Sequence, residues 1–164
     1  MIMTKSRIVI GALAAIIAIS SVSCNISKKY EREEKEKIQN YIAEHPEYDF
    51  VKKESGLYYY DITVGTGLAN TVHDTVYVKY SGKFLDGYEF DSNITSADSL
   101  IFPNGENLMI LGFEEGISYM KVGGKAILLM PSDLAFGNYS YAFPAWTPVV
   151  FEVRLLKVVP SAGK

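Results

Sequence analysis

From Phe50 onward, the chain alternates apolar and polar residues in short runs that are separated by turn signals. The clearest run, TVYVKYSGKF, places Val76, Val78 and Tyr80 on one face of an extended strand. The dipeptide Asp86-Gly87 after it is a hairpin turn signal, so the next run should return antiparallel to it. Alternation, and apolar runs bounded by Gly or Pro, predict strands at residues 57–62, 75–84, 88–90, 100–102, 126–130 and 149–159.

One segment of this region has helical periodicity instead of alternation. It covers residues 108–120 (LMILGFEEGISYM), and the pair Gly123-Gly124 closes it. A single helix among hairpin-type strands predicts an α+β fold, in which an antiparallel sheet packs against that helix. The adjacent carboxylates Glu114 and Glu115 point about 100° apart on a helix, so they are not expected to share one site.

The N-terminal segment has the pattern of an export signal. Two basic residues precede an apolar run of 12 residues at 8–19, which is shorter than the roughly 20 residues that a membrane-spanning helix needs. Small residues come next, and then Cys24. This ending resembles a bacterial lipobox, although Ser21 stands where Leu is usual. We therefore predict a signal peptide over 1–23 and lipidation of Cys24. An ordinary signal peptide and an uncleaved anchor are the alternatives.

Residues 24–49 differ in composition from the rest of the chain. Nine of the ten residues from Lys28 to Lys37 are charged, with both signs interspersed. A short apolar stripe lies after them at Ile38, Tyr41 and Ile42, and His45-Pro46 ends the helical pattern. We predict a charged helical tether over 24–49 and a globular domain over 50–164. The helix is either a solvated spacer or a dimerising or docking helix, and its sequence leaves both open.

Composition excludes several classes of function. The chain has 164 residues, is 48% hydrophobic and carries a net charge of −3, which suits one packed core and disfavours nucleic-acid binding. One Cys excludes an intrachain disulfide, and with only two His it disfavours the common zinc sites. The sequence contains no Walker loop, H-E-x-x-H or G-x-S-x-G motif. We therefore expect no cofactor and no metal.

Four motifs resemble, in order and spacing, those of the FKBP-type peptidyl-prolyl cis-trans isomerases. They are VKYSG with DG and FDS (residues 78–92), GFEEG with MKVG (112–123), MPSDLAFG (130–137) and VFEVRLL (150–156). The resemblance covers about two-thirds of the chain, from Gly56 to Val159. It implies a twisted antiparallel sheet wrapped around one short helix, and catalysis of X-Pro bond rotation.

The resemblance also implies which residues form the site. The catalytic positions fall on Tyr80, Phe90, Asp91, Phe113 and Phe136. Substrate-binding positions fall on Leu100, Phe102, Met109, Ile110 and Phe151. Asp91 should accept a hydrogen bond at the pocket edge from a neighbouring tyrosine. The loop at 138–147 is rich in aromatic residues, which either extend the pocket wall or pack among themselves: Tyr139, Tyr141, Phe143 and Trp146.

Three departures from the family pattern bear on activity. Phe113 replaces the usual Trp, Phe136 replaces a Tyr whose hydroxyl meets a substrate carbonyl, and the loop at 138–147 is shorter than usual. The leading hypothesis is an envelope folding catalyst that acts on proline-containing exported polypeptides. It would be lipid-anchored to a bacterial membrane on the periplasmic or cell-surface side, with residues 26–43 dispensable for activity. The alternatives are a catalytically weak binding module or chaperone of the same fold, and a purely structural lipoprotein.

Overall fold

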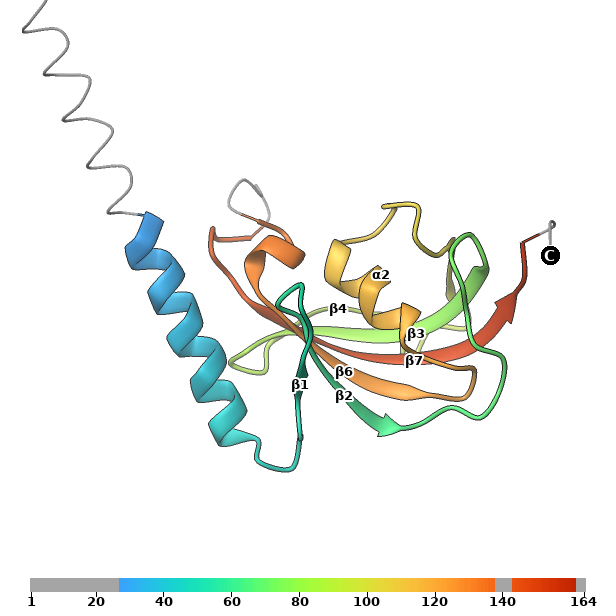
Figure 1. Cartoon of the computed structure of the whole chain (residues 1–164), viewed down its shortest axis with the longest axis horizontal. Helices are drawn as coiled ribbons and strands as arrows, with labels where there is room; N and C mark the ends of the chain where they lie inside the picture. The colour runs from blue at the N-terminus through green and yellow to red at the C-terminus, as the bar shows by residue number, and fades with distance from the viewer. Residues whose placement is uncertain (1–26, 138–142, 162–164) are drawn as a thin grey trace, which may run out of the picture. The chain divides into compact units, whose positions relative to one another are not determined.

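The computed structural model describes residues 27–137 and 143–161 (Figure 1). A helix covers residues 27–44. The elements after it are β1 (Val51–Lys52), β2 (Tyr58–Thr63), β3 (Thr75–Phe84), β4 (Glu89–Ser92), β5 (Leu100–Pro103), α2 (Leu111–Ser118), β6 (Lys125–Met130), the 3-10 helix η1 (Ser132–Leu134) and β7 (Val149–Val159). The expected α+β architecture is therefore present.

The strands of the described chain form one antiparallel sheet in the order β1-β2-β6-β7-β3-β4, with β5 also paired to β3. Its centre is the long β3–β7 ladder, which runs from the pair Thr75–Val159 to the pair Phe84–Val149. Because side chains alternate between the two faces of a strand, Val76 and Val78 on β3 both turn to the core and are fully buried. The apolar residues of the alternating pattern in the sequence thus form the buried face of the sheet.

The main core lies between the inner face of the sheet and α2, which crosses that face in Figure 1. The helix approaches β6 closely because Gly116 has no side chain. A Cβ at Gly116 would lie 2.4 Å from Cδ1 of Leu128, and one at Gly112 would lie 2.6 Å from Sδ of Met130. The two glycines of GFEEG are therefore packing residues, which bring α2 down onto the strand.

The outer face of the sheet carries a second apolar cluster, which includes part of the N-terminal helix. Ile38 is only 3% exposed. The cluster consists of Ile38, Tyr58, Ile127, Leu129 and Val150, with Tyr41, Ile42, Tyr48, Phe50, Tyr60 and Leu85 packed against it. We expected a tether through residue 49 and a domain from residue 50, but the compact unit begins at Glu34. The reason is that the short apolar stripe is buried on the sheet of its own chain.

The helix predicted at 108–120 is shorter in the structure, because α2 begins at Leu111 and ends at Ser118. Ile110, the N-cap of α2, has extended backbone angles (φ −61°, ψ 142°), so the helix cannot begin before Leu111. The pattern of apolar residues had no sign of β1 or η1. In the ranges 27–137 and 143–161, no helix is both long and apolar enough to cross a membrane.

Candidate functional site

Aromatic rings from four strands meet a ring of α2. Tyr80 of β3 packs edge-on against Phe113 of α2, with ring centroids 5.7 Å apart, and lies 5.9 Å from Phe151 of β7. Phe151 also contacts Phe113 at 5.4 Å and Phe90 of β4 at 5.7 Å, again edge-on. Phe102 of β5 completes the floor, 6.2 Å from Phe113. Edge-to-face packing of this kind is favourable and fixes the rings in a rigid, apolar surface.

Aliphatic side chains extend this surface. The partly buried residues packed against the core include Leu100, Met109, Ile110, Leu134 and Phe136. The structure therefore brings together nine of the residues that the family resemblance placed in the pocket. These are Tyr80, Phe90, Leu100, Phe102, Met109, Ile110, Phe113, Phe136 and Phe151.

Two further rings belong to this group. Phe143 stacks on Phe136 with centroids 4.0 Å apart and meets Phe90 at 5.0 Å. Phe84, at the end of β3, lies 5.0 Å from Phe90 and 5.6 Å from Phe143. We did not single out Phe84 from the sequence, although its even spacing from Tyr80 places it on the same face of β3.

The loop residues expected beside the pocket have different outcomes. Phe143 packs against the rings of the cluster. Among the described residues, Trp146 has no ring contact with this cluster. Trp146 lies half-buried in the turn before β7 with a φ of 58°. Tyr139, Tyr141 and Cys24 lie outside the described residues. No group of His, Cys, Asp or Glu that could hold a metal ion occurs in the described ranges.

A tyrosine–aspartate pair lies at the edge of the cluster. The Tyr80 hydroxyl donates to Oδ2 of Asp91 at 2.7 Å, so Asp91 does accept a hydrogen bond from a neighbouring tyrosine. Partial burial, the hydrogen bond to Asp91 and the negative charge of Asp91 together raise the pKa of Tyr80 to about 12. The phenol is therefore neutral at physiological pH and orients the exposed carboxylate.

Replacing Asp91 by Asn should lower the pKa of Tyr80, because the phenolate would no longer form next to a negative charge. Tyrosine ring carbons followed by NMR during alkaline titration give this pKa, and Tyr80→Phe identifies the resonance. Tyr41, whose pKa burial and its neighbours Tyr48 and Glu47 raise to about 12, should not move and serves as the internal control. An unchanged Tyr80 pKa in Asp91→Asn would contradict the pairing.

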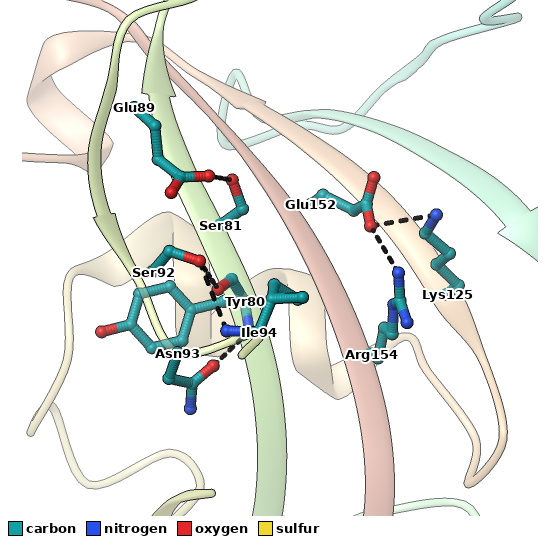
Figure 2. Close-up of polar contacts among 9 residues, drawn as sticks. All are labelled: Tyr80, Ser81, Glu89, Ser92, Asn93, Ile94, Lys125, Glu152 and Arg154. Carbon is teal, nitrogen blue, oxygen red and sulfur yellow. Dashed lines mark hydrogen bonds and ion pairs between the residues drawn. The ribbon is translucent and has the colours of Figure 1, made fainter. Parts of the chain in front are cut away.

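The backbone around Tyr80 is fixed by the segment after β4 (Figure 2). The side-chain Oδ1 of Asn93 accepts from the Tyr80 amide at 2.7 Å, and the Ser92 hydroxyl donates to the Tyr80 carbonyl at 3.2 Å. The Lys79 ammonium donates to three carbonyls of the same segment, those of Asn93, Ser96 and Asp98, at 3.1, 2.6 and 2.8 Å. These bonds hold the β4–β5 connection against β3.

An open depression beside β4 contains further acidic groups, each already engaged. Glu89 accepts from the Ser81 hydroxyl at 2.6 Å. Glu152 accepts from Lys125 at 2.9 Å and from Arg154 at 3.3 Å (Figure 2). Burial raises the pKa of Glu152, but its bonds and proximity to Lys125 and Arg154 outweigh burial, so the net effect lowers that pKa. These carboxylates act in the scaffold of the sheet.

Glu114 is a site residue whose role sequence reasoning missed. Its carboxylate is 7% exposed and accepts from the amides of Gly105, Asn107 and Met109 at 2.8, 3.1 and 2.8 Å. Glu115 points elsewhere and accepts from Ser55 and Tyr119, so the two carboxylates diverge as expected. Glu114 thus fixes the loop that carries Met109, which packs against the core beside the aromatic cluster.

The sequence of this chain matches a known protein family. The family model described as FKBP-type peptidyl-prolyl cis-trans isomerase matches residues 69–156. The chain is 37% identical over 133 residues to the FKBP-type peptidyl-prolyl cis-trans isomerase FkpA of Aeromonas hydrophila, an alignment that covers 80% of this chain and 49% of that protein. It is also 37% identical over 108 residues to the FKBP-type 22 kDa peptidyl-prolyl cis-trans isomerase of Escherichia coli, covering 65% of this chain and 52% of that one.

Solved structures give the same relationship. The crystal structure of FkpA from Escherichia coli matches with a TM-score of 0.71 and 32% identity, over 92% of this chain and 71% of that one. A peptidyl-prolyl cis-trans isomerase from Pseudomonas syringae pv. tomato matches with a TM-score of 0.68 and 26% identity, over 81% and 96%. The chain spans about half the length of the Aeromonas hydrophila and 22 kDa Escherichia coli relatives.

Proposed function

The chain belongs to the FKBP-type peptidyl-prolyl cis-trans isomerase family, and we propose that it catalyses rotation about X-Pro bonds in exported polypeptides. The observation that carries this proposal is the rigid aromatic surface around Phe113, with the Tyr80–Asp91 pair at its edge. A proline ring is apolar and compact, and a surface of this kind suits it. The proposed cellular role is that of a folding catalyst in the cell envelope.

Catalysis of X-Pro rotation requires mainly a pocket that fits the proline ring and excludes water. Rotation about a peptide bond has a barrier of about 18–20 kcal/mol, because twisting the bond removes amide resonance. For X-Pro the two ground states differ by only about 0.5–1 kcal/mol, so the catalyst has to lower the barrier and not shift the equilibrium. The twisted state has less charge separation than the planar amide, so a water-poor pocket favours it relative to bulk water.

Each part of the site has a role in this proposal. Phe113, which is 3% exposed, would form the floor under the pyrrolidine ring, with Phe151 and Phe102 beside it. Tyr80 and Asp91 would order the polar atoms of the substrate backbone at the rim. A nucleophile, a general base or a metal is not required, because no covalent bond is made or broken.

A protease-coupled assay on a short X-Pro peptide tests this function directly. The chain from residue 25 onward should speed isomerisation well above the uncatalysed process, which takes tens to hundreds of seconds at 25 °C. Asp91→Val removes a polar contact and leaves the rings in place. Expressed as a free energy of transition-state stabilisation, the loss in kcat/KM should therefore exceed the loss in the free energy of unfolding. Wild-type protein that is folded and gives no acceleration at micromolar concentration would overturn the proposal.

One observation favours a second candidate, a catalytically weak module that binds polypeptides. Phe136 stands where the family has a tyrosine, and its ring is stacked face to face on Phe143. A phenylalanine offers no hydroxyl to a substrate carbonyl at this position. The missing bond is worth about 0.5–1.5 kcal/mol, which corresponds to a loss of up to about tenfold in affinity or rate.

Phe136→Tyr separates the two candidates. If the family contact is available here, the added hydroxyl should raise kcat/KM by a few-fold to about tenfold, the effect of one net hydrogen bond. The gain should appear in kcat only if the bond is stronger at the twisted geometry than in the ground state. A folded variant with unchanged or reduced activity would mean that Phe143 and the short loop have reshaped this wall.

We also propose that Cys24 is lipidated and anchors the protein to a membrane. What supports this is the charged start, the short apolar run at 8–19 and the small residues before the lone Cys. Metabolic labelling with a fatty-acid analogue should mark the wild type and not Cys24→Ser, with Ser23→Ala as the control for signal processing. Equal labelling of the wild type and Cys24→Ser would end the lipoprotein proposal.

A further inference from the structure

The first amide of η1 lacks a local partner. Helix starts leave backbone N–H groups without intrahelical acceptors, and a side chain at the N-cap normally accepts from one of them. The N-cap of η1 is Pro131, which makes no side-chain cap hydrogen bond. Ser132, the first residue of the turn, is 2% exposed, so water is not a ready substitute.

Glu34 of the N-terminal helix supplies the missing acceptor from 98 positions earlier in the chain. Its Oε1 accepts from the Ser132 amide at 2.5 Å, and its Oε2 accepts from the Ser132 hydroxyl at 3.1 Å. Glu34 is itself 7% exposed. A buried carboxylate that accepts two hydrogen bonds from one residue is a strong and directional clamp.

Ser132 in turn organises the segment that carries Phe136. The carbonyl of Ser132 accepts from the amide of Ala135 at 3.0 Å and from the amide of Gly137 at 2.7 Å. Phe136 therefore lies between two residues that are both bound to the same carbonyl. Its ring faces Phe90 at 5.9 Å and Phe143 at 4.0 Å, which makes this segment one side of the aromatic cluster.

The position of Glu34 is set by the docking of its helix. Ile38, one helical turn further on, is buried in the outer cluster with Leu129 and Val150. These two residues are on β6 and β7, and η1 directly follows β6. The apolar contact and the carboxylate clamp thus fix the helix on the sheet at neighbouring points.

We propose that Glu34 is a positioning residue of the isomerase site, which acts through Ser132 to hold the Phe136 wall in its productive place. This inference rests on the proposed function, because it assigns a role in that reaction. It changes the expectation for the N-terminal segment: a deletion of residues 26–43 removes both the clamp and the cover of Leu129. We now expect that deletion to impair the pocket.

The test compares variants of the full-length chain in mild detergent. Glu34→Ala should lower kcat/KM by about tenfold, because a small displacement of a substrate-contacting wall is costly. Glu34→Gln, which keeps one acceptor oxygen, should fall between it and the wild type. Glu36→Ala removes an exposed carboxylate from the same helix and should be unchanged.

A second readout does not depend on activity. Hydrogen exchange at the amides of Ala135 and Gly137 should accelerate by about tenfold or more in Glu34→Ala, while exchange at Val153 in the centre of β7 stays the same. Val158→Ala serves as the stability control, because it removes buried volume at the far end of β7, where Val158 pairs with Val76, and leaves Glu34 and its helix in place. Its exchange at Gly137 should stay closer to that of the wild type.

The outcomes are distinct. Unchanged exchange at Ala135 and Gly137 in Glu34→Ala overturns the inference, whatever the activity. An equal loss of kcat/KM in Glu34→Ala and in Val158→Ala, compared at equal loss of stability, also overturns it, because the role of Glu34 would then be general support. A wild type without isomerase activity would refute the proposed function alone, and the exchange data would still decide whether Glu34 holds the Phe136 segment.

Discussion

Glu114→Ala is expected to lower the free energy of unfolding by about 2–4 kcal/mol and kcat/KM by about tenfold or more. The carboxylate accepts from three backbone amides, those of Gly105, Asn107 and Met109. An alanine leaves all three donors without their acceptor. The loop itself is mostly exposed, so water replaces part of the loss, and the expected effect stays below the sum of three buried bonds.

The loss of activity should follow from the loop geometry. Gly105 and Asn107 hold left-handed backbone conformations that turn their amides toward one point. Without a negative group at that point the loop should relax, and Met109 and Ile110, which pack against the core, should move with it. Urea denaturation gives the stability change, and the isomerisation assay on the folded variant gives the change in kcat/KM.

The chain offers a matched control at the next position. Glu115→Ala removes a carboxylate from the same helix turn that accepts from the side chains of Ser55 and Tyr119 and from no backbone amide of the described residues. Its effect should stay within about 1 kcal/mol, and activity should be nearly unchanged. Glu114→Gln should be intermediate, because one oxygen can still accept while the new NH₂ group faces amide donors. Equal effects of the two alanine variants would refute the role given to Glu114.

Local patterns predicted the strands well, because the two faces of a strand produce a direct alternation of apolar and polar residues along the sequence. β3 and β7 begin and end at the residues expected from alternation and apolar runs. The start of α2 was wrong by three residues. Leu108, Met109 and Ile110 have helical periodicity, but the carboxylate of Glu114 holds them in a loop, and no pattern within that segment announces it.

The partners of the N-terminal helix could not be predicted for a related reason. The stripe of Ile38 and its neighbours indicated that one face of the helix is apolar, but not what that face contacts. Glu34 looked like one of nine solvated charges, and only the fold brings it to Ser132. Contacts between residues far apart in sequence depend on topology, which a single sequence expresses weakly.

The ring cluster illustrates what a family resemblance adds to the pattern. Alternation alone places Tyr80 and Phe84 on one face of β3, and apolarity alone makes Phe113 and Phe151 core residues. Their meeting at one point follows from the order of the strands, which the family motif supplies and alternation does not. Substitutions at Asp91, Phe136 and Glu114, which surround these rings, test the roles proposed for the site.

The glycine of VKYSG should be indispensable to that cluster. A Cβ at Gly82 would lie 2.7 Å from Cε1 of Phe151 and 2.9 Å from Cε2 of Phe90. Gly82 does not have a positive φ, so the backbone itself would accept an alanine. On backbone grounds alone, Gly→Ala would stabilise the protein by about 0.4–1 kcal/mol through the unfolded state. The steric contact with two rings reverses that sign.

Gly82→Ala is therefore expected to cost about 1–3 kcal/mol of stability and to lower kcat/KM by about tenfold or more. Phe151 is buried and contacts Tyr80, Phe90 and Phe113, so its ring cannot turn aside without displacing the surface on which the proline would bind. The isomerisation assay and urea denaturation measure the two effects, with Lys83→Ala at the next, exposed position of β3 as the control. If Gly82→Ala keeps its kcat/KM within twofold of the control, the packed position of Phe90 and Phe151 is not what activity requires, and the pocket must tolerate a displaced wall.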